Sequence, residues 1–144
     1  MVTKIAIGRV VKILGWSVMF GAGGACATPA IVDYVIDGDT FAARLLFDDG
    51  IKIKVRVRVA DIDTPEINGM CEFEKVMANR ARDRLVELMP VGTVVELVDI
   101  TDDKYLGRID AGVILPDGRN LSRIITDEGL GRSYNGGKRM SWCK

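Results

Sequence analysis

Histidine is absent from this chain of 144 residues, and cysteine and aromatic residues are scarce, with 3 Cys and 6% aromatic residues. The lack of histidine excludes general acid-base chemistry by an imidazole and disfavours a zinc site. No internal repeat or low-complexity segment is present. The length predicts a single domain, and 48% hydrophobic residues are enough to form its core.

The chain also lacks an apolar run long enough to cross a membrane. The run from Ile13 to Phe20 is well short of the ~20 residues that a spanning helix needs. Basic residues precede this run, and Ala25-Cys26-Ala27 follows it with the small residues that signal peptidase requires. We therefore expect a signal peptide at 1–27, a mature domain at 28–144 and a secreted or periplasmic protein. A lipid on Cys26 and an uncleaved cytosolic tail are the alternatives.

Cleavage after Ala27 would change both the charge and the cysteine count. The 20 basic and 20 acidic residues balance, but removing the three basic residues of the leader leaves 17 against 20, a net charge of −3. Cys71 and Cys143 would remain, and an even pair in an oxidising compartment indicates a disulfide. Such a bridge would close a loop of about 70 residues and contribute up to roughly 4 kcal/mol. The alternative is two unrelated thiols.

The mature part has the pattern of five strands and two helices. β-branched and aromatic residues mark the strands, and apolar residues at helical spacing mark the helices. Gly129 occupies the position where a helix often ends in the left-handed conformation. The expected strands are 30–36, 40–47, 51–59, 93–98 and 109–115, and the expected helices are 71–89 and 121–128.

The order of these elements predicts the fold class. Three strands, a helix, two strands and a short C-terminal helix are the order of a five-stranded OB-type barrel, which is α+β and mainly β. Charged residues of the first helix, Glu74 among them, are expected on a solvated face. The basic row Lys52, Lys54 and Arg56 on the third strand is expected to face solvent too. The fold alone does not give a function.

Three short motifs contain the residue types of metal-assisted phosphodiester chemistry. Asp37-Gly38-Asp39-Thr40 lies in a turn, Arg58 to Glu66 follows the third strand, and Asp103 to Arg108 precedes the fifth. Carboxylates can hold a hard divalent cation and activate water, while arginines can bind a phosphate. Pro65 imposes an extended conformation on Thr64, which suits a carbonyl ligand. Taken alone, Asp-Gly-Asp is more often just a turn.

In this order and register, the three motifs resemble those of the staphylococcal nuclease-like (thermonuclease) family, over about residues 30–134. Leu106 adds one residue to the family's Lys-Tyr-Gly-Arg spacing, so the loop must bulge. The resemblance implies that Asp39, Asp63 and the Thr64 carbonyl bind Ca²⁺, that Glu66 is the general base or orients the water, that Arg58 and Arg108 hold the scissile phosphate, and that Lys104, Tyr105 and Tyr134 flank the nucleotide.

The function expected from this resemblance is that of a Ca²⁺-dependent, sugar-nonspecific nuclease. It would hydrolyse DNA, RNA or both to 3′-phosphate ends, as a monomer with no stable protein partner. The net charge of −3 favours short or single-stranded contacts over long duplexes. A noncatalytic OB-type module that binds nucleic acid or protein and a phosphodiesterase for small nucleotides are the alternatives. Lys138 and Arg139 are expected in a solvated tail, with backbone contacts to nucleic acid as the alternative.

Overall fold

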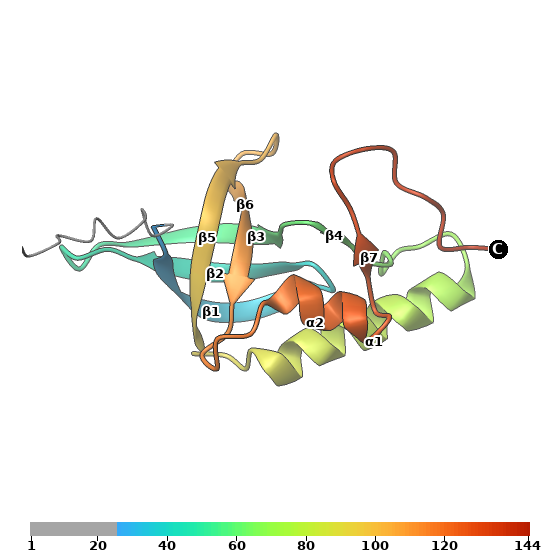
Figure 1. Ribbon diagram of the computed structural model, residues 1–144, viewed down its shortest axis with the longest axis horizontal. Helices are drawn as coiled ribbons and strands as arrows, with labels where there is room; N and C mark the ends of the chain where they lie inside the picture. Colours follow the sequence, from blue (N-terminus) through green and yellow to red (C-terminus); the bar gives the residue numbers. More distant parts are fainter. Residues whose placement is uncertain (1–25) are drawn as a thin grey trace, which may run out of the picture.

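The protein is a closed five-stranded barrel with two helices packed along one side (Figure 1). The computed structural model describes residues 26–144, so the predicted leader lies outside the described residues except for Cys26 and Ala27. The strands follow the order β1-β2-β3-β6-β5, and β5 pairs with β1 to close the barrel. This confirms the OB-type α+β fold. The barrel strands are β1 (Thr28–Asp37), β2 (Thr40–Leu46), β3 (Lys52–Val59), β5 (Val94–Asp102) and β6 (Arg108–Ile114).

The core fills the inside of the barrel. Alternate residues of each strand point inward, so that Val32, Phe41, Val57, Leu97 and Val113 are fully buried. Each such side chain contributes about 1.5–3 kcal/mol through burial. Most pairings are antiparallel, but β3 and β6 are parallel. The predicted solvated row of β3 is confirmed, because its first three basic residues are exposed.

Helix α1 (Glu72–Leu88) lies against the barrel and ends just before Pro90. It buries Ala78, Ala81 and Leu85, and the two alanines let the helix approach closely. Glu74 is buried as well, so its predicted place on a solvated face is wrong. Among the described residues, no helix is both long and apolar enough to cross a membrane.

Helix α2 (Leu121–Asp127) is short and has a side-chain cap. Asn120 accepts a hydrogen bond from the Arg123 backbone amide, which satisfies one of the free donors at the helix start. Gly129 has a φ of 71°, so the predicted left-handed end is confirmed. Leu121 and Ile125 anchor the helix in the core.

Two strands were not expected from the sequence. Strands β4 (Ile62–Asp63) and β7 (Arg132–Ser133) form a small antiparallel sheet beside the barrel. This sheet brings the segment after α2 alongside the acidic loop that follows β3 (Figure 1). Strand β5 also continues to Asp102 rather than ending at Val98, past an irregularity at Asp99, where φ is 51°.

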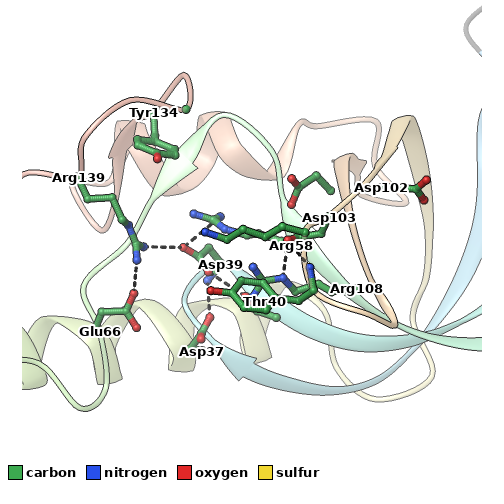
Figure 2. Close-up of a pocket in the computed structure, with 14 residues that line it drawn as sticks. Asp37, Asp39, Thr40, Arg58, Glu66, Asp102, Asp103, Arg108, Tyr134 and Arg139 are labelled. Carbon is green, nitrogen blue, oxygen red and sulfur yellow. Dashed lines mark hydrogen bonds and ion pairs between the residues drawn. The ribbon is translucent and has the colours of Figure 1, made fainter.

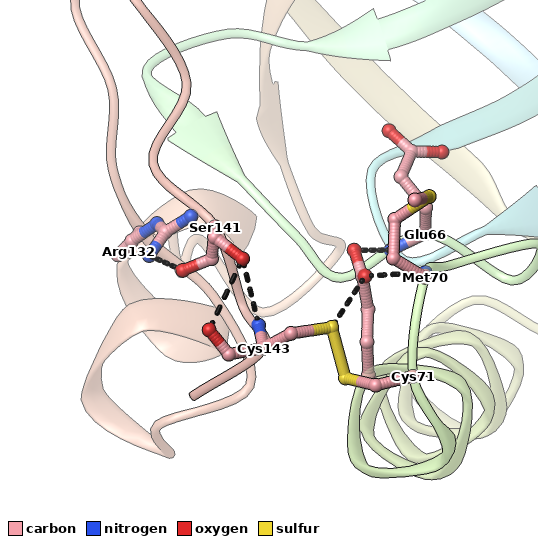
Figure 3. Close-up of a disulfide and its surroundings, with 7 residues drawn as sticks. Glu66, Met70, Cys71, Arg132, Ser141 and Cys143 are labelled. Atoms are coloured by element: carbon pink, nitrogen blue, oxygen red, sulfur yellow. Dashed lines mark hydrogen bonds between the residues drawn. A yellow bond between two sulfur atoms is a disulfide. The ribbon is translucent and has the colours of Figure 1, made fainter.

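A disulfide fixes the far end of the chain. Cys71, just before α1, is bonded to Cys143, and their Cα atoms are 5.9 Å apart (Figure 3). The predicted pairing is confirmed. The bond holds residues 134–143, called here the C-terminal segment, next to the loop between β4 and α1 (Figures 1 and 3).

Candidate active site

A cleft of about 530 Å³ opens at the side of the barrel (Figure 2). Its walls come from β2, β3, the loop after β4, the β5–β6 loop and the C-terminal segment. Seven of the nine residues that the sequence predicts for the site line it. These are Asp39, Arg58, Glu66, Lys104, Tyr105, Arg108 and Tyr134.

The turn that carries Asp39 is packed tightly against α1. A Cβ on Gly38 would lie 2.7 Å from the Ala81 Cβ and 2.9 Å from the Thr64 hydroxyl. Only glycine therefore fits between the helix and the loop that follows β4. This close packing places the buried Asp39 beside that loop. The Asp-Gly-Asp turn therefore positions a carboxylate in addition to reversing the direction of the chain.

Arg58 lies at the centre of the cleft. Its position in β3 pairs it with Thr40 on one side and Asp110 on the other. Its guanidinium is 3.5 Å from the Asp39 carboxylate and donates a hydrogen bond of 3.3 Å to the Ile62 carbonyl. These two contacts hold the guanidinium in a fixed position.

Asp63 and Thr64 do not line the cleft, and both are only 2% exposed. The two oxygens of Asp63 have different partners. Oδ2 accepts hydrogen bonds from Arg132 at 3.0 Å and from the Trp142 indole at 3.2 Å, whereas Oδ1 is paired with Arg139 at 2.5 Å. The Thr64 side chain packs against Gly38. Asp63 is therefore reached from the cleft through Arg139.

The backbone of Glu66 is held by the carboxylate of Glu74, which is buried and not on the surface as expected. Glu74 accepts hydrogen bonds from the backbone amides of Glu66 at 3.2 Å and Met70 at 3.0 Å (Figure 3). A Cβ on Gly69 would lie 2.4 Å from the Glu74 side chain, so the loop can wrap this carboxylate only with glycine there. Glu74 thereby positions the Glu66 backbone, while the Glu66 carboxylate reaches the cleft.

The β5–β6 loop absorbs its extra residue as the sequence predicts. Leu106 projects fully into solvent, and Gly107 takes a φ of +76° that favours glycine. This bulge leaves Arg108 in the cleft, 4.4 Å above the ring of Tyr105. Lys104 lies 5.1 Å from the centre of the same ring. The loop therefore brings two cations and an aromatic ring to one wall.

The guanidinium of Arg108 is paired with Asp103 at 2.5 Å. Its hydrogen bond holds the pKa of the Asp103 carboxyl below its usual value. Burial and the charge of Asp103 raise the pKa of Asp110, whose Oδ1 has no hydrogen-bond partner among the described residues. We call Arg58, Arg108, Asp103 and Asp110 the arginine end of the cleft.

At the opposite end, which we call the carboxylate end, Asp37, Asp39 and Glu66 line the cleft, and the buried Asp63 lies behind Arg139. Burial, together with the charge of Asp39, raises the pKa of Asp37 from 3.8 to about 6. The side chains of this end offer carboxylate oxygens, the type of ligand that a hard divalent cation such as Ca²⁺ prefers.

Sequence reasoning missed three residues at the carboxylate end: Arg132, Arg139 and Trp142. The expectation that Arg139 belongs to a solvated tail is wrong, because its guanidinium bonds Asp63 and also Glu66, the second of which Figure 2 shows. Lys138, by contrast, is exposed as expected. Arg139 is 76 residues from Asp63, so no local pattern could indicate the contact. The nearest signal was Cys143, through its pairing with Cys71.

The fold and the cleft define a class of protein: an OB-type barrel with opposed carboxylates and arginines beside it. The family model described as staphylococcal nuclease homologue matches residues 56–141. The match includes Arg58, Asp63, Glu66 and Arg108, and Asp39 precedes it. The chain belongs to the staphylococcal nuclease homologue family.

A second similarity is more distant. A protein of Mycobacterium marinum (strain ATCC BAA-535 / M), named cytokinin riboside 5'-monophosphate phosphoribohydrolase, is 27% identical over 115 residues. The alignment covers 78% of this chain and 59% of that protein. The chain therefore spans little more than half the length of that relative.

Proposed function

We propose that the protein is a Ca²⁺-dependent nuclease that hydrolyses phosphodiester bonds of DNA, RNA or both. The observation that carries this proposal is the meeting of the three motifs in one cleft, which brings Asp39 and Glu66 together with Arg58 and Arg108 (Figure 2). Membership of the staphylococcal nuclease homologue family supports it. The proposed base and metal ligands lie at the carboxylate end and the proposed phosphate ligands at the arginine end, so neither end alone suffices for the reaction.

In this proposal, Asp39, Asp63 and the Thr64 carbonyl hold Ca²⁺, which supplies Lewis acidity to the phosphate and its attacking water. Glu66 takes a proton from the water, a role typically worth a factor of ~10²–10⁴. Glu74 accepts a hydrogen bond from the Glu66 backbone amide and so holds the loop in place, which supports that role.

Arg58 and Arg108 bind the phosphate in this proposal and offset the negative charge that develops on it. A guanidinium suits this work because its planar fork bonds two oxygens and remains charged. Arg108 is paired with Asp103 through Nε at 2.5 Å, and its two terminal nitrogens are the ones that would bind the phosphate. Departure of the 5′ oxygen would leave 3′-phosphate ends.

Tyr105 and Tyr134 line the same cleft, together with Lys104. We propose that the rings flank the nucleotide, because bases stack on aromatic side chains without regard to sequence. This fits a nuclease with little sequence preference.

For the location, we propose secretion or export to the periplasm. The bond between Cys71 and Cys143 supports this, because disulfides persist in oxidising compartments.

A second candidate is a phosphodiesterase for small nucleotides. Asp102, Asp103 and Asp110 line the arginine end and would repel a long polyanion. The relative from Mycobacterium marinum is named for action on a riboside 5′-monophosphate, which has no phosphodiester bond, so such a compound serves in the test as one that neither candidate should cleave.

The test is cleavage of end-labelled single-stranded DNA and RNA, of a dinucleotide and of a nucleoside 5′-monophosphate, each with Ca²⁺, Mg²⁺ or EGTA. The nuclease proposal expects the long strands to be cut with Ca²⁺, to carry 3′-phosphate ends and to stay intact in EGTA. Cleavage of the dinucleotide alone would favour the second candidate. Binding of the long strands without cleavage of any substrate would contradict both and favour a binding module.

A further inference from the structure

The guanidinium of Arg139 occupies the meeting point of the carboxylate end. Its nitrogen atoms lie 2.5 Å from Glu66 Oε1 and 3.8 Å from Asp39 Oδ2 (Figure 2). They also lie 2.5 Å from Asp63 Oδ1. These three carboxylates come from two separate stretches of the chain, and one cation contacts all of them. A side chain of this protein thus fills the position that the donor set offers to a metal ion.

The two carboxylate oxygens of Asp63 have different kinds of partner. The partners of Oδ2 are fixed in place, whereas the partner of Oδ1 can be replaced. Oδ2 is bonded by Arg132 and Trp142, which also stack on each other at 4.1 Å. Arg132 belongs to β7 and is fixed by the pairing of that strand with β4. Oδ1 faces Arg139, whose side chain is 41% exposed. Arg139 can leave Oδ1 without disturbing the core.

The C-terminal segment keeps Arg139 close even when the guanidinium leaves. The Tyr134 backbone amide donates to the Asp61 carbonyl at 2.9 Å, which ties the start of the segment to the loop after β3, and Gly136 turns the chain with a φ of 92°. On the other side of Arg139, Cys143 is bonded to Cys71 (Figure 3). The segment is thus anchored at both ends, and a tethered group has a high effective concentration at its site.

We propose that Arg139 is a built-in counter-cation that a divalent cation must displace from Asp63 and Glu66, so that this residue sets the metal affinity of the site. The inference rests on the proposed Ca²⁺ site. A guanidinium and a metal ion cannot share Oδ1 at close range, because two cations at such a distance repel strongly. Their binding to the carboxylates is therefore mutually exclusive.

This competition has a consequence for the proposed base. While Arg139 is in place, the Glu66 carboxylate is bonded to it and is not free to take a proton. Binding of the metal releases Glu66 at the same moment. The apparent metal affinity is the intrinsic affinity multiplied by the fraction of molecules in which Arg139 has left the site.

The experiment is a calorimetric titration of Ca²⁺ into the wild-type protein, Arg139→Gln and Lys138→Gln. The two variants lose the same charge one residue apart, but Lys138 is exposed and makes no ion pair among the described residues. Arg139→Gln is expected to bind Ca²⁺ about tenfold more tightly, which corresponds to a site that is about 10% free in the wild type. Lys138→Gln is expected to stay within about twofold of the wild type, because it changes only the distant charge.

A second variant tests whether the effect comes from the guanidinium itself and not from a change in folding. Arg139→Lys keeps the charge but loses the fork that bonds two carboxylates, so its affinity is expected to lie between those of wild type and Arg139→Gln. Equal affinities in wild type and Arg139→Gln, or weaker binding by Arg139→Gln, would overturn the inference and leave the proposed metal site intact. Absence of Ca²⁺ binding in every protein would overturn the metal site and the inference together.

The disulfide supplies an independent check. Reduction lengthens the free tether and lowers the effective concentration of Arg139, so it should tighten Ca²⁺ binding in wild type and leave it unchanged in Arg139→Gln. The same change in both proteins would contradict the tethering.

Discussion

The two ends of the cleft neutralise their functional groups in different ways. At the arginine end, Arg108 is paired with Asp103, which lies five residues earlier across a single loop. At the carboxylate end, Asp63 and Glu66 are paired with Arg139, more than 70 residues later in the chain. One end is preset by local sequence, and the other depends on a distant segment that a disulfide holds in place.

This difference shows how the two ends could be changed independently. An ion pair within one loop moves with that loop. An ion pair with a distant segment can be altered by releasing the disulfide that holds the segment, without changing the carboxylates themselves. The predictions below test the two ends separately.

The largest effect is expected from removing the proposed base at the carboxylate end. Glu66→Gln should lower turnover by ~10²–10⁴ while changing substrate affinity little, because the carboxylate acts on the water and not on the substrate. Steady-state cleavage of single-stranded DNA measures both quantities. Glu72→Gln, at the start of α1, is the charge-matched control, and unchanged turnover in Glu66→Gln would remove Glu66 from the mechanism.

At the arginine end, Arg58→Lys and Arg108→Lys should each lower kcat/KM by roughly 10²–10³, because lysine keeps the charge but loses the fork. The comparison predicts that Arg108→Lys leaves Ca²⁺ affinity unchanged. Cleavage kinetics and calorimetry on the same preparation measure the two effects. A loss of Ca²⁺ binding in Arg108→Lys would show that the two ends are not separate.

Breaking the anchor should affect the stability of the fold. Cys71→Ser opens a loop spanning 72 positions, and the free energy of unfolding should fall by about 2–4 kcal/mol under oxidising conditions. Under reducing conditions the variant and the wild type should match. Thermal unfolding measures this, and an equal loss in both conditions would leave Cys71 with a packing role only.

The smallest effect concerns Asp37, whose pKa in the folded protein is about 6 rather than 3.8. Between these values the folded state holds a proton that the unfolded state releases, so stability falls as pH rises through this window. After allowance for partial exposure, the charged carboxyl costs the fold about 1–2 kcal/mol above pH ~6.

Asp37→Asn should therefore raise the Tm at about pH 8 and leave it unchanged at about pH 3.5. The asparagine oxygen can keep the bond that Asp37 accepts from the Asp39 amide, so the turn is preserved. Scanning calorimetry across this range gives the answer, with the exposed Asp48→Asn as a matched charge change. A pH-independent difference would mean that the effect is one of packing.

Much of the fold could be predicted because it follows from local patterns. Alternation along 51–59 and the turn at Gly50 specify a hairpin, and β-branched runs gave the other barrel strands to within a few residues. The two-residue strands β4 and β7 could not be found, since so short a stretch has no periodicity and exists only through its partner.

The same distinction between local patterns and long-range contacts applies to the candidate site. The three motifs and the bulge at Leu106 could be predicted because, taken together, the motifs resemble those of a known family, whose usual spacing shows Leu106 as an extra residue. Burial of Glu74 could not, because it depends on backbone amides of a loop that wraps it. The contacts of Arg139 depend on a fold-wide pairing, so a basic residue near the end of the chain looked like part of a solvated tail.

The measurement that tests the account most directly is a crystal structure of the protein with Ca²⁺ and a short, uncleavable single strand of DNA. The account predicts Ca²⁺ on Asp39 and on Asp63 Oδ1, a phosphate between Arg58 and Arg108, and Arg139 displaced from both carboxylates. A phosphate bound elsewhere, or Ca²⁺ absent from the cleft while Arg139 keeps its pairs with Asp63 and Glu66, would contradict it.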